Sequence, residues 1–193
     1  LASSAASDVY KRQYLDKRRI RRGIAVRFGM GAAPDSWDAL LTAMTHKGYT
    51  KQELISAGLA VNGKNGRLYD KFRNRLMLPV IDVRGDVVGF GSRVLDKSEP
   101  KYMNTPETLT YSKRRILYGM NLAKKSKRSN IILCEGNLDV VTLHQAGFDN
   151  AVASMGTALT QEQLRLLSRY TKELVLCYDN DNAGQQATRR ALE

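Results

Sequence analysis

The chain has 193 residues, and its 31 Lys and Arg outnumber its 19 Asp and Glu, which gives a net charge of +12 at pH 7. A hydrophobic share of 42% is typical of a packed globular protein, and the length allows one sizeable domain or two small ones. No run approaches about 18 consecutive apolar residues, and the first residues lack an apolar signal segment, so we expect neither a membrane span nor secretion.

The positive charge is concentrated in the first two thirds of the chain. Residues 1–130 hold 26 Lys and Arg against 11 Asp and Glu, whereas residues 131–193 hold 5 against 8. We expect a polyanion as the partner of the basic part. The plainer alternative is a basic surface that only keeps the protein soluble.

The two cysteines, Cys134 and Cys177, both lie in apolar runs directly after a leucine. Two cysteines and two distant histidines have no metal-ligand spacing. We therefore interpret the cysteines as reduced strand residues of an intracellular protein.

The two ends of the chain suggest a fragment. Residues 1–13 show no core pattern, and we interpret them as a non-native or disordered leader. The chain does not begin with Met, and it stops at Glu193 inside a helical pattern. We therefore expect a piece of a longer protein, truncated at its C-terminus.

The first part of the chain predicts three helices. An arginine-rich helix is expected over residues 14–28, and a second helix follows a loop and is capped by Asp35 or Ser36. A third helix begins with a capping box at Thr50 and ends at Gly58.

The middle of the chain predicts strands. Residues 75–95 predict a β-hairpin that turns at "RGD", and Pro79 predicts an edge or a bulge in its first strand. The alternating basic residues of "KFRNR" predict one cationic strand face. After a loop with two prolines, we expect a basic helix that runs to about Lys125.

From about residue 128 the pattern alternates between strands and helices. "NIILCEG", "NAVASM" and "ELVLCYD" predict strands, and a helix follows each of them, one starting with a capping box at Thr160. This order predicts a parallel sheet covered by helices. The predicted fold class is therefore an α+β N-terminal subdomain over residues 14–127 and an α/β, Rossmann-like subdomain over residues 128–193.

Four carboxylates are expected at one edge of this sheet. Glu135 and Asp179 end two of its strands, Asp181 follows in the loop, and Asp139 lies four residues after Glu135. Ligands bind at the carboxyl ends of parallel strands, and Mg²⁺ prefers oxygen ligands. The pattern therefore predicts a magnesium site. The alternative is that these acids only cap the helices that follow.

Several motifs resemble one known family. "ILCEGNLDVV", "AVASMGTALT" and "LVLCYDNDNAGQQATRRALE" resemble the Toprim domain, with its E-G-x-x-D and D-x-D motifs. "YDKFRNRLMLPVIDVRGDVVGFGSRVL", "PKYMNTPET" and "SKRRILYG" resemble the catalytic core of bacterial DnaG-type primases. The resemblance runs from about Tyr14 to Glu193. D-x-D alone is a weak signal, but this string of motifs in this order is specific.

The resemblance implies a DNA primase core, which makes short RNA primers on single-stranded DNA from nucleoside triphosphates during DNA replication. It implies that Glu135, Asp179 and Asp181 hold Mg²⁺ or Mn²⁺ for two-metal nucleotidyl transfer, and that Asp139 supports catalysis. It also implies a cytoplasmic protein of the replication fork, whose replicative helicase partner binds a C-terminal domain that is absent here.

The resemblance further implies a surface that guides the template and the nucleotides. Side chains of this kind bind phosphates and stack on bases. The residues expected there are Arg18, Arg73, Arg75, Arg93, Lys101, Tyr102, Asn104 and Lys113. Loop packing is the alternative for Tyr102, and a surface ion pair with Asp96 is the alternative for Arg93. We expect Trp37 in the core and no chemistry from His144.

Three residues depart from the family pattern. Asn180 stands where the family has Gly inside D-x-D, and Arg19 and Arg114 each replace a further Gly. Asn tolerates a positive φ, so we expect the turn at Asn180 to be retained. The family's zinc-binding domain and downstream acidic cluster are not in this sequence.

Two other functions fit part of the sequence. A Toprim nuclease or topoisomerase fragment would share the carboxylates, although a topoisomerase also needs a tyrosine nucleophile. A non-catalytic fragment that binds single-stranded DNA would use the acids as helix caps. Its DNA binding would depend on salt and would be indifferent to Mg²⁺.

Overall fold

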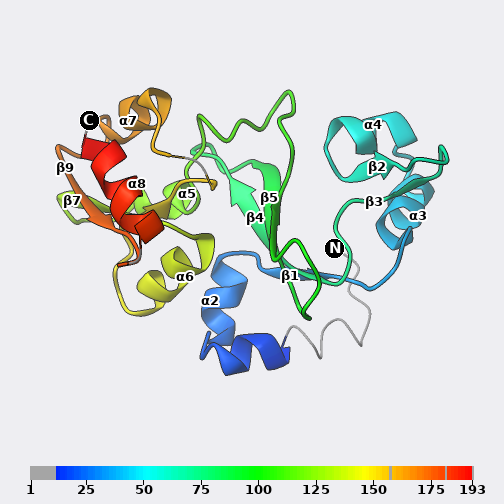
Figure 1. Ribbon diagram of the computed structural model, residues 1–193, viewed down its shortest axis with the longest axis horizontal. Helices are drawn as coiled ribbons and strands as arrows, with labels where there is room; N and C mark the ends of the chain where they lie inside the picture. The colour runs from blue at the N-terminus through cyan, green and yellow to red at the C-terminus, as the bar shows by residue number, and fades with distance from the viewer. Residues whose placement is uncertain (1–11, 157, 181, 193) are drawn as a thin grey trace. The chain divides into compact units, whose positions relative to one another are not determined.

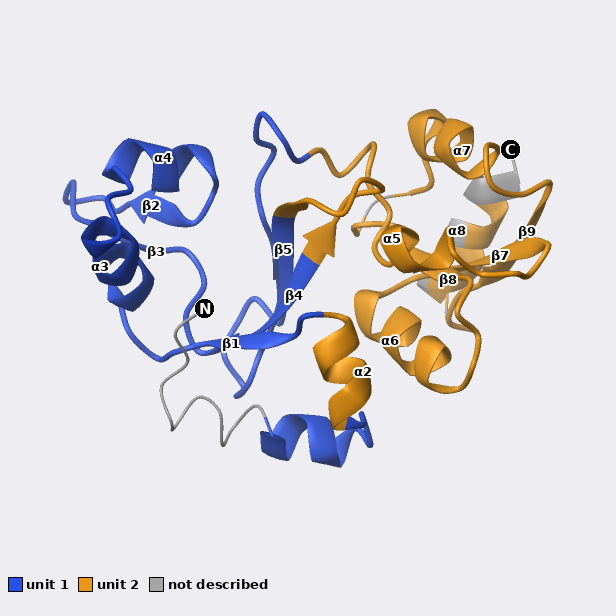
Figure 2. Ribbon diagram, turned by 180° about the vertical axis from the view of Figure 1, so that it is seen from behind, with its two compact units in different colours: residues 1–21, 29–79, 89–111 blue, residues 22–28, 80–88, 112–193 orange. Residues whose placement is uncertain are grey.

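A computed structural model describes residues 12–156, 158–180 and 182–192 (Figure 1). The chain divides into two compact units, which are coloured separately in Figure 2. Unit 1 comprises the chain up to Arg21, Gly29–Pro79 and Gly89–Tyr111, and unit 2 comprises Arg22–Phe28, Val80–Val88 and the chain from Ser112 onward. Within the described ranges, no helix has the length and apolar character needed to cross a membrane.

A four-stranded sheet forms the centre of unit 1, with the order β1-β4-β5-β6. Its strands are β1 (Gly31–Ala33), β4 (Arg75–Ile81), β5 (Val87–Val94) and β6 (Tyr102–Asn104). β1 pairs antiparallel with β4, and β6 pairs antiparallel with β5. The predicted hairpin is confirmed, because β4 and β5 are neighbours and the turn between them contains Gly85 with a φ of 107°.

Pro79 lies at a point of β4 that β1 does not reach. β1 pairs only with Arg75, Leu76 and Met77. One flank of β4 therefore lacks a strand partner at Pro79, which is where a residue without an N–H is tolerated. The strand is an inner one in the sheet order, but its proline occupies a local edge.

The arginine-rich segment does not form the single helix expected over residues 14–28. Residues 12–17 and α2 (Arg22–Arg27) are helical, and the helix is interrupted between them at Arg19, whose φ is 55°. This left-handed conformation is costly for any residue with a Cβ and open to glycine. The family pattern has Gly at this position because glycine adopts a positive φ readily.

The second helix starts later than expected. α3 (Ala39–His46) has Asp38 as its N-cap, and the Asp38 side chain makes no capping hydrogen bond. The buried carboxylate of Asp70 accepts the backbone N–H of Leu40 at 2.7 Å and that of Leu41 at 2.8 Å. The prediction of a cap at residue 35 or 36 was therefore wrong, because a side chain about 30 positions further along the chain satisfies these donors.

A two-stranded ribbon and a short helix complete unit 1. Asp70 ends β3 (Leu68–Asp70), which pairs antiparallel with β2 (Ala60–Asn62) in a ribbon that the sequence pattern did not predict. α4 (Lys51–Ser56) begins with the predicted capping box at Thr50, which is confirmed.

The basic helix expected to run to about Lys125 is reduced to α5 (Met120–Ala123). Tyr118 forms an antiparallel bridge with Ala153, and Gly119 has a φ of 81°. A Cβ on Gly119 would lie 2.8 Å from Cγ1 of Val140, so only glycine fits between the bridge and the helix. This pairing with a distant strand overrides the local helical pattern.

Unit 2 has the predicted β-α-β-α-β-α order. The elements in this order, which follow α5 along the chain, are β7 (Asn130–Cys134), α6 (Asn137–Gln145), β8 (Ala151–Ala153), α7 (Gln161–Leu167), β9 (Glu173–Cys177) and α8 (Asn182–Leu192). The strand order is β8-β7-β9, and both pairings are parallel. One apolar cluster joins Leu133 and Val152 of the sheet to Met120 of α5 and Leu167 of α7. The predicted fold class is confirmed.

Candidate functional site

Glu135 and Asp179 meet at the carboxyl end of the parallel sheet in unit 2. β7 and β9 are neighbours in register, with Cys134 opposite Cys177, so the residues that follow them leave the sheet at the same edge. The backbone N–H of Asp179 donates to Oε2 of Glu135 at 3.3 Å. Both side chains are exposed. The structure thus places the Glu135 carboxylate beside the backbone of Asp179, so two of the four predicted residues meet at this edge.

Gly184 fixes the start of α8 against Asp179. A Cβ at Gly184 would collide with the carbonyl oxygen of Asp179 and would lie 2.9 Å from its carbonyl carbon. Only a glycine lets this turn of α8 (Figure 1) pack on the backbone of Asp179.

Asp139 acts as a helix cap in this structure. It lies in the first turn of α6, and its Oδ2 accepts the N–H of Gly136 at 3.0 Å. A Cβ at Gly136 would lie 2.9 Å from that oxygen. One oxygen of Asp139 therefore caps the helix, as the alternative interpretation of the acids predicted. The predicted ligand Asp181 lies outside the described residues.

The carboxylate edge offers oxygen ligands for a hard cation. Among the residues that the structure describes, no group of three or more His, Cys, Asp and Glu side chains is placed to hold a metal ion. Glu135 and Asp179 remain as a pair of exposed carboxylates. Mg²⁺ usually takes one or two protein carboxylates and completes its shell with water and phosphate oxygens, so this donor set fits Mg²⁺.

Arg93 and two tyrosines form a cluster on unit 1. The Arg93 guanidinium lies 4.7 Å from the ring centroid of Tyr14 and 5.7 Å from that of Tyr102, its register partner across β5 and β6. Nζ of Lys101 lies 5.6 Å from the Tyr102 ring, and the Arg18 guanidinium lies 5.7 Å from the Tyr14 ring. Four of the predicted nucleic-acid residues are thus close to one another.

This tyrosine–arginine cluster has an accessible side and a buried side. Tyr102 is 54% exposed, whereas Tyr14 is half-buried, and burial raises the pKa of its hydroxyl above the ordinary value. The loop-packing alternative for Tyr102 does not fit this exposure. Among the residues that the structure describes, no ion pair joins Arg93 to Asp96. The Asp96 carboxylate instead accepts hydrogen bonds from Ser98 and Asn74. An exposed ring backed by arginine is suited to stacking on a base.

Trp37 lies on the surface and not in the core, and it forms an aromatic group with Arg73 and Tyr69 that was not predicted. It was expected in the core, but it is 59% exposed. The Arg73 guanidinium lies 4.2 Å from the Trp37 ring and 4.9 Å from the Tyr69 ring, and the two rings meet edge to face. The signal available in the sequence was the polar context "PDSWD", which is unusual for a core tryptophan.

Arg75 is buried, which contradicts the cationic strand face predicted from "KFRNR". Residues 71–74 are not in a strand, and Arg75 is the first residue of β4 with only 5% exposure. Its Nη2 donates to the carbonyl of Pro100 at 2.8 Å, and burial lowers its pKa. Arg75 therefore supports the loop around Pro100, and its predicted contact with nucleic acid would require that loop to move.

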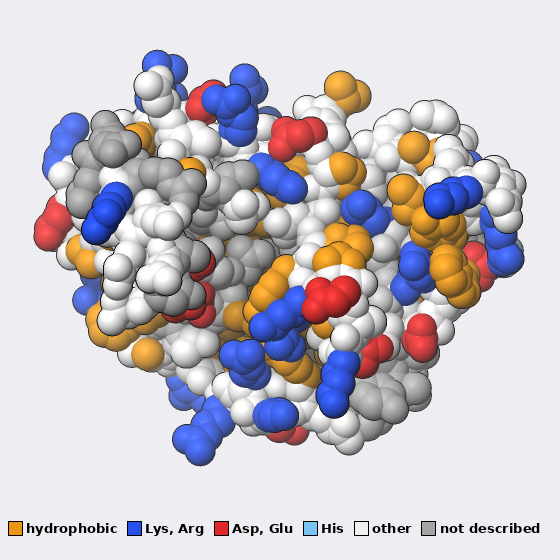
Figure 3. All heavy atoms as spheres, viewed as in Figure 1, with side chains coloured by type: hydrophobic (Ala, Val, Ile, Leu, Met, Phe, Trp, Pro, Cys, Tyr) orange, Lys and Arg blue, Asp and Glu red, His pale blue; other side chains and the backbone are white. Residues whose placement is uncertain are grey.

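The remaining predicted residues lie in both units. Asn104 belongs to β6 and is the register partner of Gly91. Lys113 belongs to unit 2, where its carbonyl accepts the side-chain amide of Gln163 at 3.0 Å. Basic side chains are prominent over the face drawn in Figure 3, in keeping with the net charge of the chain.

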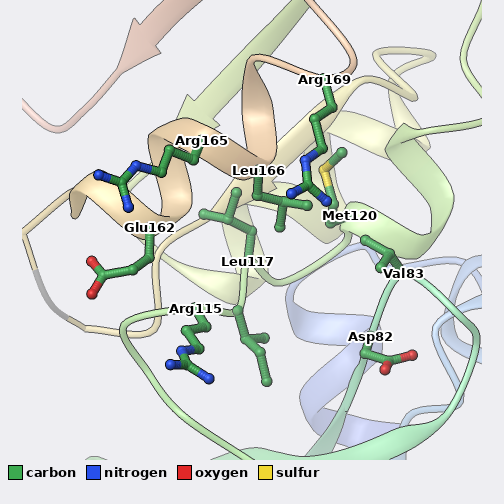
Figure 4. A pocket seen from close by; sticks show the side chains of 10 residues that line it. Asp82, Val83, Arg115, Leu117, Met120, Glu162, Arg165, Leu166 and Arg169 are labelled. Atoms are coloured by element: carbon green, nitrogen blue, oxygen red, sulfur yellow. The ribbon is translucent and has the colours of Figure 1, made fainter.

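Unit 2 also has a pocket of about 350 Å³ that the sequence analysis did not find. Its walls include the aliphatic residues Leu117 and Leu166, and Arg115, Arg165 and Arg169 surround them (Figure 4). None of the predicted site residues lines this pocket. Asp82 and Glu162 also line the pocket, so its charged side chains carry both signs.

Comparison with known families shows which family the chain belongs to. The family described as "DNA primase catalytic core, N-terminal domain" matches residues 2–124, and the family described as "Toprim-like" matches residues 132–193. This chain belongs to the DNA primase catalytic core family. The resemblance inferred from the motifs is thereby confirmed.

Individual relatives agree with this assignment. The DNA primase of Clostridium acetobutylicum is 51% identical over 184 residues, which cover 95% of this chain and 30% of that protein. The Escherichia coli primase catalytic core has a TM-score of 0.90 at 43% identity, covering 96% of this chain and 60% of that one. A DnaG primase catalytic domain bound to single-stranded DNA has a TM-score of 0.89 at 42% identity, covering 96% and 61%. The chain thus spans about 30% of the length of the curated primases that it matches.

Proposed function

We propose that this chain is part of a DNA primase that synthesises short RNA primers on single-stranded DNA from nucleoside triphosphates by nucleotidyl transfer. The observation that carries the proposal is the meeting of Glu135 and Asp179 at one edge of a parallel sheet, in a member of the primase core family. The identity of more than 40% to primases over almost the whole chain supports it.

The carboxylates are proposed to hold divalent metal ions, Mg²⁺ or Mn²⁺. Glu135 and Asp179 would be ligands, Asp181 would join them from outside the described residues, and Asp139 would support them from α6. Bound there, the ions would activate a 3′-hydroxyl and stabilise the leaving pyrophosphate. The chain's own contribution is orientation, because the N–H of Asp179 holds the Glu135 carboxylate and Gly184 holds the Asp179 backbone.

The aromatic and basic side chains of unit 1 are proposed to bind the template strand and the nucleotides. The exposed Tyr102 ring, next to Arg93 and Lys101, would stack on an unpaired base while the cations contact phosphates. Arg18, Arg73 and Asn104 would extend this binding surface on unit 1, and Lys113 of unit 2 is proposed as a separate contact to nucleic acid or nucleotide. Two solved relatives whose names state bound DNA, one with single-stranded DNA and one with a duplex carrying a 6-nucleotide overhang, support the assignment.

Further proposals concern the whole protein. We propose a boundary between the two subdomains near residues 127 and 128, and a role in replication in the cytoplasm. We also propose a replicative helicase as a partner of the complete protein. These proposals rest on the family membership alone.

The test is the synthesis of labelled RNA from ribonucleoside triphosphates on a single-stranded DNA template, at high protein concentration. We expect short RNA products that appear only with Mg²⁺ or Mn²⁺. Nicked or shortened template without RNA would instead indicate a Toprim nuclease. Template binding that is unaffected by Mg²⁺, with no product at any protein concentration, would contradict the proposal and favour a non-catalytic DNA-binding fragment.

A further inference from the structure

Cys134 and Cys177 are register partners on the neighbouring strands β7 and β9 (Figure 1). Register partners project their side chains from the same face of a sheet, and neighbouring strands lie about 4.8 Å apart. That spacing is within the Cα separation of roughly 4.4–6.8 Å that a disulfide spans. The strand register therefore places the two Cα atoms within the range that a disulfide can span.

The two cysteines differ in their access to solvent. Cys134 is fully buried, whereas Cys177 is exposed. An oxidant in solution therefore meets Cys177 first, and Cys134 is the only other cysteine of the chain. An accessible thiol next to a second cysteine is one feature of reversible oxidation sites.

The pair lies directly behind the carboxylate edge. Cys134 precedes Glu135, and Cys177 is two residues before Asp179. The hydrogen bond between the N–H of Asp179 and Glu135 crosses the same two strand ends. A covalent link between the cysteines would therefore act on the backbone that orients both carboxylates.

We propose that Cys134 and Cys177 form a reversible oxidation site, at which a peroxide converts the two thiols to a disulfide that joins β7 to β9 and impairs the carboxylate edge. The Cys177 sulfur attacks one peroxide oxygen, the O–O bond breaks, and a sulfenic acid and one water form. The Cys134 sulfur then attacks the Cys177 sulfur, the S–O bond breaks, and a second water leaves. The thiols lose two electrons, the peroxide is reduced to water, and a dithiol reductant reverses the change.

The chemical part is tested by treating the chain with hydrogen peroxide and counting free thiols under denaturing conditions. We expect both thiols to disappear, a loss of two hydrogen atoms by mass spectrometry, a Cys134–Cys177 cross-link in the non-reduced peptide map, and full recovery with dithiothreitol. The Cys177→Ser variant should keep its buried thiol. Over-oxidation of Cys177 with Cys134 still free, or a disulfide between two chains, would overturn the proposal.

The effect on the carboxylate edge rests on the proposed primase function and is read from primer synthesis. We expect peroxide to abolish synthesis by the wild-type chain, dithiothreitol to restore it, and Cys177→Ser to be insensitive to peroxide. Unchanged synthesis by the disulfide form would overturn the regulatory role. The two proposals fail separately: a reduced chain that makes no primers contradicts the primase function, whereas an absent disulfide contradicts the oxidation site.

Discussion

The carbonyl oxygen of Asp179 occupies the space that a Cβ on Gly184 would need. This close approach couples the first turn of α8 to the residue that follows β9. Because Asp179 also donates its N–H to Glu135, Gly184 indirectly positions both carboxylates.

Replacing Gly184 by Ala should therefore displace α8 and lower the free energy of unfolding by about 2 kcal/mol or more. Gly23→Ala is the matched control, since Gly23 is an exposed residue of α2 and a Cβ there meets no atom within 4 Å. The control should be stabilised by about 0.5–1 kcal/mol, because alanine favours a helix over glycine. Urea unfolding of both variants gives the comparison, and equal stability of the two would contradict the packing described here.

Asp70, and not the N-cap residue Asp38, should stabilise the start of α3. Asp70→Ala removes the acceptor of two helix N–H groups and should cost about 2 kcal/mol, whereas Asp70→Asn retains one acceptor and should cost about half as much. Asp38→Ala removes only an exposed ion pair with Arg67 at 3.7 Å and should change stability by less than about 0.5 kcal/mol. Denaturant midpoints of the three variants decide the order, and a larger effect at Asp38 would refute this cap.

His144 should make the stability of unit 2 depend on pH. It is 4% exposed, its Nε2 donates to the carbonyl of Ala151 at 2.9 Å, and burial lowers its pKa from the ordinary value of 6.5. Below pH 6.5 the unfolded chain binds a proton that the folded chain does not, so stability falls as the pH decreases towards the lowered pKa of the folded state. The role of His144 is structural, in keeping with the expectation that it takes part in no chemistry.

The His144→Gln variant keeps an amide donor for the Ala151 carbonyl but has no titrating group. Its unfolding free energy should be less sensitive to pH just below 6.5 than that of the wild-type chain. The measurement is a series of denaturant titrations across this range, and identical pH profiles for both proteins would contradict the assignment.

Tyr102 should contribute to the binding of single-stranded DNA by stacking. Tyr102→Ala is expected to weaken binding of a short fluorescent oligonucleotide by about 1–3 kcal/mol. The control is Tyr49→Ala, because Tyr49 is 49% exposed and comparable in size, and it lies outside the predicted binding surface. Anisotropy titrations that show equal losses for both variants would rule out a specific stacking role.

Arg93 should contribute to DNA binding mainly by contacting a backbone phosphate. Arg93→Ala is expected to reduce the slope of log affinity against log salt concentration by about one, because one phosphate contact is lost. The slope is obtained from the same anisotropy titrations at several salt concentrations. An unchanged slope together with lower affinity would instead indicate that Arg93 acts only by supporting Tyr14 and Tyr102.

Local patterns predicted the parts of the fold that depend on local physics. The capping boxes at Thr50 and Thr160, the turn at Gly85 and the alternating strands and helices of unit 2 all appear as expected. The wrong predictions concern helices whose ends are determined by residues far away in the sequence. Tyr118 pairs with Ala153 in place of continuing a helix, and Asp70 caps α3 from β3.

The candidate site shows the same division. Glu135 and Asp179 lie at one edge as predicted, because parallel strands that are neighbours end at the same edge of a sheet. Whether a basic or aromatic side chain is buried depends on the loops around it, which sequence patterns do not define. Trp37 was therefore wrongly placed in the core, and Arg75 was wrongly placed on an open strand face.

The central claim is that the edge at Glu135 and Asp179 serves metal-dependent primer synthesis, and Asp179→Asn tests it most directly. The matched control is Glu173→Gln, which removes an exposed carboxylate at the opposite end of the same strand, β9. Incorporation of labelled ribonucleotides on single-stranded DNA should be abolished by Asp179→Asn at every Mg²⁺ or Mn²⁺ concentration, with the fold intact by circular dichroism, and should be retained by Glu173→Gln. Primer synthesis by Asp179→Asn at the wild-type rate, or an equal loss in both variants, would contradict the account.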